Sequence, residues 1–180
     1  MGKNPENSYD WMGKIETEFV MSLVVRKIRA EDDPHIAVVI RSVLEEHGVT
    51  MPGTAYHDKS LDYMSSFHHP AGSIYFVAEW DGKIIGGSGI YPTQGLPENT
   101  CELVKMYVLN AFRGRGVARL LLEKCIEFSA THGYKNIYLE TLPELSNAVG
   151  MYQKFGFKKL DEPLGNTGHF ACTLRMLLVL

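Results

Sequence analysis

Two β-rich runs separated by a single Asp-Gly step constrain the fold of this chain most strongly. The runs extend from Ile74 to Trp80 and from Lys83 to Tyr91, and only Asp81 and Gly82 lie between them. An Asp-Gly pair readily adopts the positive φ angles of a tight hairpin turn. The two runs are therefore predicted to pair as antiparallel strands.

Further strands are predicted where β-branched and aromatic residues gather in short runs bounded by turn residues. These runs cover residues 23–29, 102–109, 136–141, 157–160 and 169–177. In the last run Phe170, Cys172, Leu174 and Met176 alternate with Ala171, Thr173 and Arg175, which is the period of a half-buried strand. The chain is thus predicted to hold about seven strands.

Apolar residues at helical spacing predict about four helices. They cover Glu31 to Gly48, a short stretch through Leu61 and Met64, Gly114 to Thr131, and Ala148 to Gly156. Because the hairpin comes early and strand–helix–strand crossovers come late, we predict an α+β domain with a mixed sheet. The pattern is weakest over residues 50–72, where a variable segment is expected.

The size and charge of the chain restrict its partners. The chain has 180 residues, and 18 Lys and Arg against 21 Asp and Glu give a net charge of −3. Residues 22–180 suffice for a single domain, whereas residues 1–21 show no sustained period and are interpreted as a poorly ordered leader. A weakly acidic chain without a basic run lacks the charge pattern of a nucleic-acid-binding protein, so no nucleic-acid partner is expected.

Cysteine and hydropathy patterns favour a cytoplasmic protein. Cys101, Cys125 and Cys172 are isolated and odd in number, as in a reducing compartment. Neither a signal peptide nor an apolar run of bilayer length is found, so no membrane partner is expected. The seven histidines are interpreted mostly as surface or capping residues, and no metal site is predicted.

The stretch from Glu102 to Arg119 carries the clearest chemical signal. A predicted strand runs into a loop with Gly114 and Gly116, and the loop opens an amphipathic helix. The unpaired amides of a first helical turn favour an anion, and glycines let a phosphate approach the backbone. A dinucleotide-binding loop would need a third glycine where Arg119 stands, and a P-loop would need Gly-Lys-Ser/Thr, so neither site is predicted.

Two motifs carry a resemblance to a known family. Arg113-Gly114-Arg115-Gly116-Val117-Ala118 matches Gln/Arg-x-x-Gly-x-Gly/Ala, and Met151-Tyr152-Gln153-Lys154-Phe155-Gly156-Phe157 is similar to Leu-Tyr-x-Lys-x-Gly-Phe. With both motifs in this order, the chain resembles the GNAT superfamily of acyl-CoA-dependent N-acyltransferases. The resemblance implies that residues 22–180 form one N-acetyltransferase domain with a mostly antiparallel sheet of about seven strands flanked by about four helices.

The resemblance also implies acetyl-CoA as co-substrate, without a metal. The pyrophosphate of coenzyme A would lie on Arg113, Gly114, Arg115, Gly116, Val117 and Ala118, held mainly by backbone amides. The pantetheine arm would pair with the main chain of Met106, Tyr107 and Val108. Many family members carry an asparagine seven residues before the tyrosine of the second motif, where this chain has Leu145.

Two catalytic residues are implied by the resemblance. Tyr152 would protonate the leaving thiolate, and Glu102, eleven positions before Arg113, would act as the general base. A buried core tyrosine and a solvent-facing strand glutamate are the structural alternatives.

The resemblance predicts transfer of an acetyl group to a primary amine, either a small molecule or a peptide, by direct transfer in a ternary complex. The choice of amine would depend on residues 50–72 and the final strands. An acyl-CoA-binding regulatory module without turnover and an interaction protein that has lost the cofactor are the alternatives. A homodimer is an open alternative to a monomer.

Overall fold

The computed structural model describes residues 22–67 and 70–180, so the predicted leader and the pair His68-His69 lie outside the described residues. Within them, seven strands form one sheet in the order β1-β2-β3-β4-β5-β7-β6. Every neighbouring pair is antiparallel except β4 and β5. Of the described helices, none is both long and apolar enough to span a membrane.

The strands are β1 (Leu23–Lys27), β2 (Ile74–Trp80), β3 (Lys83–Tyr91), β4 (Thr100–Val108), β5 (Asn136–Thr141), β6 (Lys158–Leu160) and β7 (Leu174–Val179). The helices are α1 (Asp33–Glu46), α2 (Met64–Phe67), α3 (Val117–Thr131) and α4 (Ser146–Lys154). The predicted mixed, mostly antiparallel α+β sheet with four helices is thereby confirmed for the described residues. The predicted hairpin is also confirmed, because Asp81 and Gly82 have φ angles of +47° and +77° between β2 and β3.

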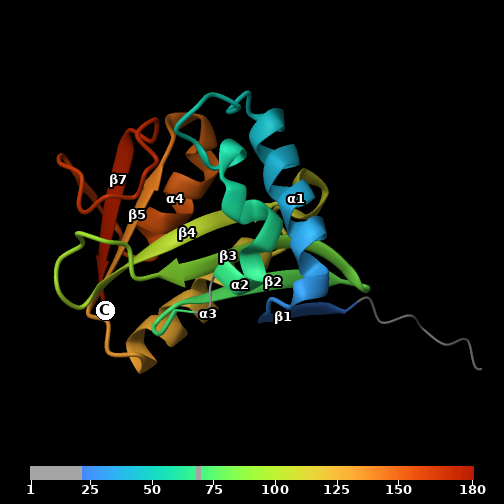
Figure 1. The fold of residues 1–180 in the computed structure, drawn as a ribbon, viewed down its shortest axis with the longest axis horizontal. Coiled ribbons are helices and arrows are strands. Elements are labelled where there is room, and N and C mark those ends of the chain that lie inside the picture. Colours follow the sequence, from blue (N-terminus) through green and yellow to red (C-terminus); the bar gives the residue numbers. More distant parts are fainter. Residues whose placement is uncertain (1–21, 68–69) are drawn as a thin grey trace, which may run out of the picture.

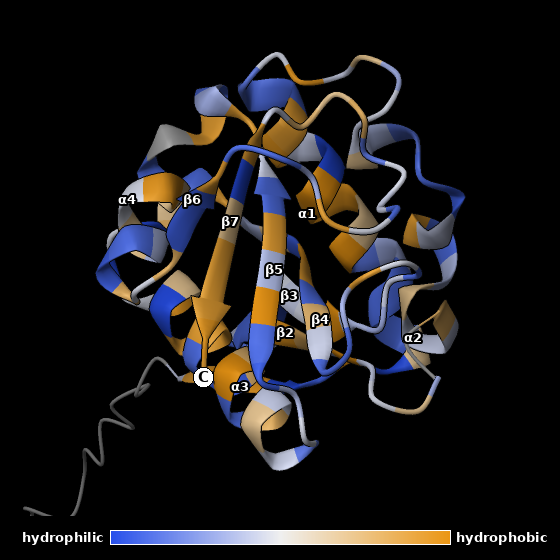
Figure 2. Ribbon diagram, turned by 90° about the vertical axis from the view of Figure 1, so that its left-hand side faces the viewer, coloured by the Kyte–Doolittle hydropathy of each residue, from blue (hydrophilic) through white to orange (hydrophobic). Residues whose placement is uncertain are grey.

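Helices cover both faces of the sheet, with α1 and α2 in front of it and α3 behind it in Figure 1. The alternation along β2 explains this arrangement, since successive strand residues point to opposite faces. Tyr75 and Val77 belong to one buried cluster with Ile36 of α1, whereas Ala78 packs with Leu121 of α3. The middle of β5 and β7 is hydrophobic as well (Figure 2).

The strands β4 and β5 pair only where they begin. Thr100, Cys101 and Glu102 of β4 pair with residues 136–138 of β5. Beyond Glu102, pairing between these two strands ends within the described residues, so this side of β4 is left without a strand partner. Backbone donors and acceptors at such an edge are available to an extended ligand.

A β-bulge interrupts β4 at Lys105 and Met106. Gly87 pairs with Tyr107 and Gly89 pairs with Val104, so two residues of β4 lie opposite one residue of β3. Lys105 has a φ of +50°, which is uncommon for a residue with a side chain. The Tyr75 hydroxyl donates a 2.8 Å hydrogen bond to the Lys105 carbonyl oxygen. This bond satisfies a carbonyl at the point where the regular pairing between β3 and β4 is interrupted.

The C-terminal strand differs from the prediction. The strand β7 begins at Leu174, whereas residues 169–172 form a turn closed by a 2.9 Å hydrogen bond from the Cys172 amide to the His169 carbonyl oxygen. The prediction of Phe170 as a strand residue was wrong, because it lies in this turn, and its side chain is 80% exposed. Alternating polarity can also occur in a turn, and only the tertiary contacts distinguish the two.

Other boundaries also differ from the prediction. The helix α3 begins at Val117 instead of Gly114, since the positive φ angles of Gly114 and Gly116 place both glycines in the preceding turn. The first strand ends at Lys27, two residues earlier than predicted.

Candidate functional site

The loop between β4 and α3 forms one side of a large cavity of about 400 Å³. Gly116 directly precedes the first residue of α3, so the unpaired amides of the first helical turn and the positive end of the helix dipole lie at this loop. The cavity lining includes Met106, Tyr107, Val108, Arg113, Gly114, Gly116, Val117 and Ala118. These are all but one of the residues predicted to bind the cofactor, so the fold brings the strand and the loop together.

The two arginines of the loop have different surroundings. Arg113 donates to both carboxylate oxygens of Glu46 at 2.8 Å and from Nε to the Val108 carbonyl oxygen at 2.9 Å. The Arg115 guanidinium lies over the Trp80 ring, 5.4 Å from its centroid, and Arg115 does not line the cavity. Arg113 therefore fastens the loop to the end of α1. Backbone amides rather than guanidinium groups of Arg113 and Arg115 are left to meet an anion.

A second, smaller cavity of about 50 Å³ adjoins the first, and Met106, Tyr107, Leu145 and Ala148 line both. Glu102 of β4 and Tyr152 of α4 also line the smaller cavity. The two residues predicted to be catalytic therefore share one cavity, which touches the larger one at the strand segment predicted for pantetheine.

Glu102 is a buried carboxylic acid, because only 4% of its surface is exposed. The solvent-facing alternative is therefore wrong. The Thr93 hydroxyl donates a hydrogen bond to Glu102 Oε2. Burial nevertheless raises the pKa of Glu102, because desolvation disfavours the charged form and outweighs the Thr93 hydrogen bond. A raised pKa makes Glu102 a more effective proton acceptor than an exposed glutamate.

Tyr152 is 5% exposed. Its hydroxyl donates a weak hydrogen bond to Met106 Sδ, 3.5 Å away. Thioether sulfur is a weak acceptor, so the hydroxyl can still be redirected toward a stronger one. Desolvation raises the pKa of Tyr152, so the phenol keeps its proton at neutral pH. A protonated phenol can act as a hydrogen-bond donor or as a general acid.

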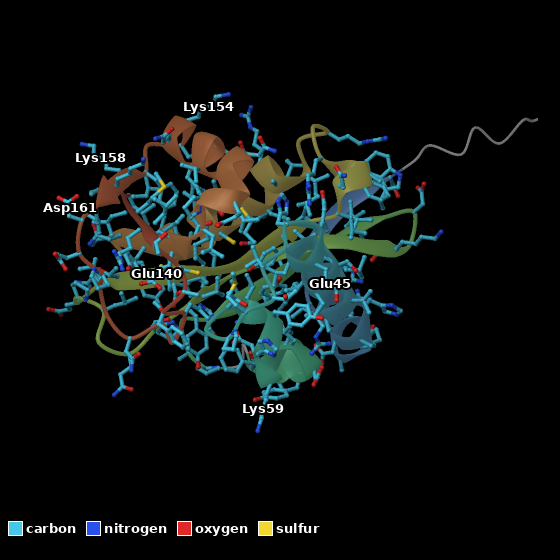
Figure 3. All side chains as sticks on the ribbon, turned by 90° about the horizontal axis from the view of Figure 1, so that it is seen from above. Glu45, Lys59, Glu140, Lys154, Lys158 and Asp161 are labelled. Atoms are coloured by element: carbon cyan, nitrogen blue, oxygen red, sulfur yellow. The ribbon has the colours of Figure 1, made fainter. Side chains whose placement is uncertain are left out.

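Sequence reasoning missed other charged groups of the smaller cavity. Lys105, Glu140 and His169 line it. The His169 side chain is only 18% exposed, so this histidine is not among those that lie at the surface. Glu140 lies within the outline of the molecule in Figure 3, whereas Lys154 and Lys158 lie at its rim. Of these three residues, only Lys105 could have been suspected from the sequence, because it directly precedes the segment predicted to bind pantetheine.

Groups that would support other chemistries are not evident in the described residues. Cys101, beside Glu102, is fully buried, and desolvation raises the pKa of its thiol to about 11. A thiol of this kind is a poor nucleophile at neutral pH. The described residues contain no group of three or more His, Cys, Asp or Glu side chains placed to hold a metal ion.

Comparison with known proteins decides the family. The model of the acetyltransferase (GNAT) family matches residues 40–157, more than half of the chain. The chain belongs to the GNAT acetyltransferase family. This GNAT protein is thus an N-acyltransferase, and the matched region holds the loop, Glu102 and Tyr152.

Relatives and solved structures agree with this assignment. The GNAT protein is 41% identical over 157 residues to the uncharacterised N-acetyltransferase YjgM of Escherichia coli (strain K12), covering 87% of this chain and 94% of YjgM. A GNAT acetyltransferase from Staphylococcus aureus Mu50 has a TM-score of 0.78 at 18% identity, over 88% of this chain and 99% of that chain. PaiA N-acetyltransferase from Thermoplasma acidophilum, solved with coenzyme A, has a TM-score of 0.68 at 18% identity, over 89% and 100% of the two chains. At these identities the two solved structures show a common fold.

Proposed function

We propose that this enzyme transfers the acetyl group of acetyl-CoA to a primary amine, directly and within a ternary complex. The observation that carries the proposal is the junction of the two cavities at Met106 and Tyr107. One cavity has the unpaired amides of a helix N-terminus, and the other has a buried carboxyl and a buried phenol. A nucleotide thioester and an amine could therefore meet at the junction.

The larger cavity fits coenzyme A in its chemistry. The amides after Gly114 and Gly116 would hold the pyrophosphate, as helix N-termini commonly hold phosphate. The position that a Cβ atom would take at either glycine has no atom within 4 Å, apart from those of the adjacent residues. The loop is therefore open on the side of its glycines. Met106, Tyr107 and Val108 would pair with the amides of the pantetheine arm, because β5 does not occupy this edge. The coenzyme A bound to the related fold of PaiA supports this choice of ligand.

The small cavity supplies the acid and base chemistry. Acetyl-CoA supplies the acetyl thioester, whose C–S bond breaks as the amine nitrogen forms the new C–N bond. An ammonium ion cannot attack, so Glu102 takes a proton from the incoming amine, directly or through water. Tyr152 donates a hydrogen bond or its proton to the leaving sulfur. Holding both reactants at the junction supplies a further part of the rate acceleration.

An acetyl-transfer assay with a panel of amines tests this function. Release of the coenzyme A thiol is followed with time, and mass spectrometry identifies the acetylated product. Amine-dependent thiol release with an N-acetyl product is expected. A thermal shift with acetyl-CoA but no thiol release with any amine would instead identify a regulatory module that binds acyl-CoA.

A further inference from the structure

The charged side chains that line the small cavity form two pairs of opposite sign. Glu102 and Glu140 are acidic, and Lys105 and His169 are basic. A simple amine has one positive group and needs only the acidic pair. The presence of both pairs is complementary to a ligand that carries a positive and a negative group.

The basic pair converges on one point. Lys105 Nζ lies 2.6 Å and His169 Nε2 lies 3.1 Å from the same atom, Oδ2 of Asp58. The Lys105 side chain is 6% exposed and the His169 side chain 18%, so both act where charge-assisted hydrogen bonds are strong. Two donors from distant parts of the chain thus form a binding position for a carboxylate oxygen.

The carboxylate in this position belongs to a surface segment rather than to the cavity wall. Asp58 lies between two short 3₁₀ turns, Ala55–His57 and Lys59–Tyr63, and its side chain is 25% exposed. The hydrogen bond from His169 and the charge of Lys105 outweigh desolvation and lower the pKa of Asp58, so an anion is favoured here. A rotation of this side chain toward solvent would leave the position to another carboxylate.

The acidic pair is bound only by neutral donors. Glu140 accepts hydrogen bonds of 2.6 Å from both the Tyr138 and the Thr167 hydroxyl groups, and Glu102 accepts one from Thr93. No cation is paired with either carboxylate among the ion pairs of the described residues. An ammonium ion is the ligand that such carboxylates lack.

Resting on the proposed function, we propose that the acceptor is a small amine that also carries a carboxylate, as an amino acid does. Its ammonium group lies at Glu102 and Glu140, and Glu102 removes the proton before attack. Its carboxylate replaces Asp58 at Lys105 Nζ and His169 Nε2. With Asp58 turned outward, the acidic pair faces the ammonium group of the zwitterion and the basic pair faces its carboxylate.

Matched pairs of amines test the proposal, since each amino acid is compared with its decarboxylated amine: alanine with ethylamine, leucine with isoamylamine, and lysine with cadaverine. We expect kcat/KM to be at least about tenfold higher for the amino acid of each pair, the effect of a buried charge-assisted bond. Equal or higher values for the decarboxylated amines would overturn the proposal.

Three variants test whether the preference for amino acids over decarboxylated amines depends on Lys105 and Asp58. Lys105→Met should lower kcat/KM for amino acids about tenfold or more and affect the decarboxylated amines less, which a general loss of structure would not do. Asp58→Asn should keep or increase the preference for amino acids, because it removes the competing carboxylate. Asp62→Asn, in the exposed pair with Arg41, is the matched control on the same segment and should leave the preference unaltered. An equal loss for both members of each pair in Lys105→Met would contradict the proposal.

A binding measurement separates this proposal from the proposed function. Calorimetry with the coenzyme A complex compares the affinity of alanine with that of ethylamine, without any turnover. If no amine releases thiol but alanine binds more tightly, the acetyl transfer to amines is wrong and the carboxylate site stands. If thiol is released but alanine binds no better than ethylamine, the carboxylate site is wrong and the acetyl transfer stands.

Discussion

The hydroxyl group of Tyr152 on α4 lies 3.5 Å from Sδ of Met106 on β4. This contact joins the second sequence motif to the part of β4 that β5 leaves unpaired, just before the first motif. A phenol in this place can reach a sulfur atom beside β4. In the proposed mechanism, the thioester sulfur of acetyl-CoA takes the place of the Met106 thioether as acceptor of this hydrogen.

We predict that Tyr152→Phe lowers kcat about tenfold or more, because a positioned donor to the leaving thiolate is lost. The interaction grows in the transition state, so KM should change less than kcat. Steady-state rates with a saturating amine check this. Tyr56→Phe is the control. The Tyr56 hydroxyl donates a hydrogen bond to Glu45 at the surface, so this variant should retain full activity. Full activity in a folded Tyr152→Phe protein would mean that water, and not Tyr152, protonates the leaving thiolate.

We predict that Glu102→Gln lowers kcat by about 10² to 10⁴ at neutral pH, the usual contribution of a general base. In the parent, kcat/KM should rise with pH through the pKa of Glu102, which burial places above that of an ordinary glutamate. The variant should lack this rise in the pH–rate profile. A profile identical to that of the parent would remove Glu102 from the mechanism.

The same substitution should increase stability at neutral pH. Because the folded protein raises the pKa of Glu102, the folded state binds the proton more tightly than the unfolded chain, and stability falls as pH rises through these values. Glu102→Gln removes this loss, so its Tm should exceed that of the parent at pH 7 and approach it near pH 4. Thermal unfolding at both pH values measures the difference. A Tm for Glu102→Gln below that of the parent at pH 7 would show that the buried carboxylate is stabilising.

We predict that Gly116→Asp abolishes most of the stabilisation by acetyl-CoA, because it places a carboxylate beside the amides proposed for the pyrophosphate. A ligand at a hundredfold excess over its Kd stabilises the native state by about 2.7 kcal/mol, so the loss is easily measured by thermal shift. Gly133→Asp is the matched control. Gly133 has the same positive φ of about 80° and equally open space, but it lies past the other end of α3. A normal shift in folded Gly116→Asp would place the cofactor elsewhere.

Asp32 joins the first strand to the first helix and should be important for stability. Its carboxylate accepts hydrogen bonds from Arg26 at 2.6 and 2.9 Å and from the Arg29 amide at 2.8 Å, and its side chain is 4% exposed. Asp32→Asn should cost about 2 to 3 kcal/mol in the free energy of unfolding, because it leaves a largely buried arginine underpaired. These bonds lower the pKa of Asp32, so its contribution is present at neutral pH and is lost as pH falls below about 4. Urea unfolding at pH 7 and at pH 3 should show a smaller difference between the parent and the variant at the lower pH.

The local elements of this protein could be predicted from its sequence. The turn between β2 and β3 follows from Asp81 and Gly82, whose backbone preferences act within two residues. The stripes of α1 and α3 and the glycines before α3 are equally local, and the two motifs were enough to indicate the family. Patterns of this kind depend on neighbours in sequence, which is why they could be interpreted without coordinates.

The set of side chains that meet in the smaller cavity could not be predicted without the folded structure. Lys105, Asp58 and His169 come from three distant segments, with Lys105 in the bulge of β4 and His169 in the turn at residues 169–172. The sequence pattern gave a strand for that turn, because alternating polarity does not reveal whether a partner strand is present. Burial of Glu102 likewise required the packing of β4 against its neighbours. Long-range contacts fix these features, and they leave no periodic trace along the chain.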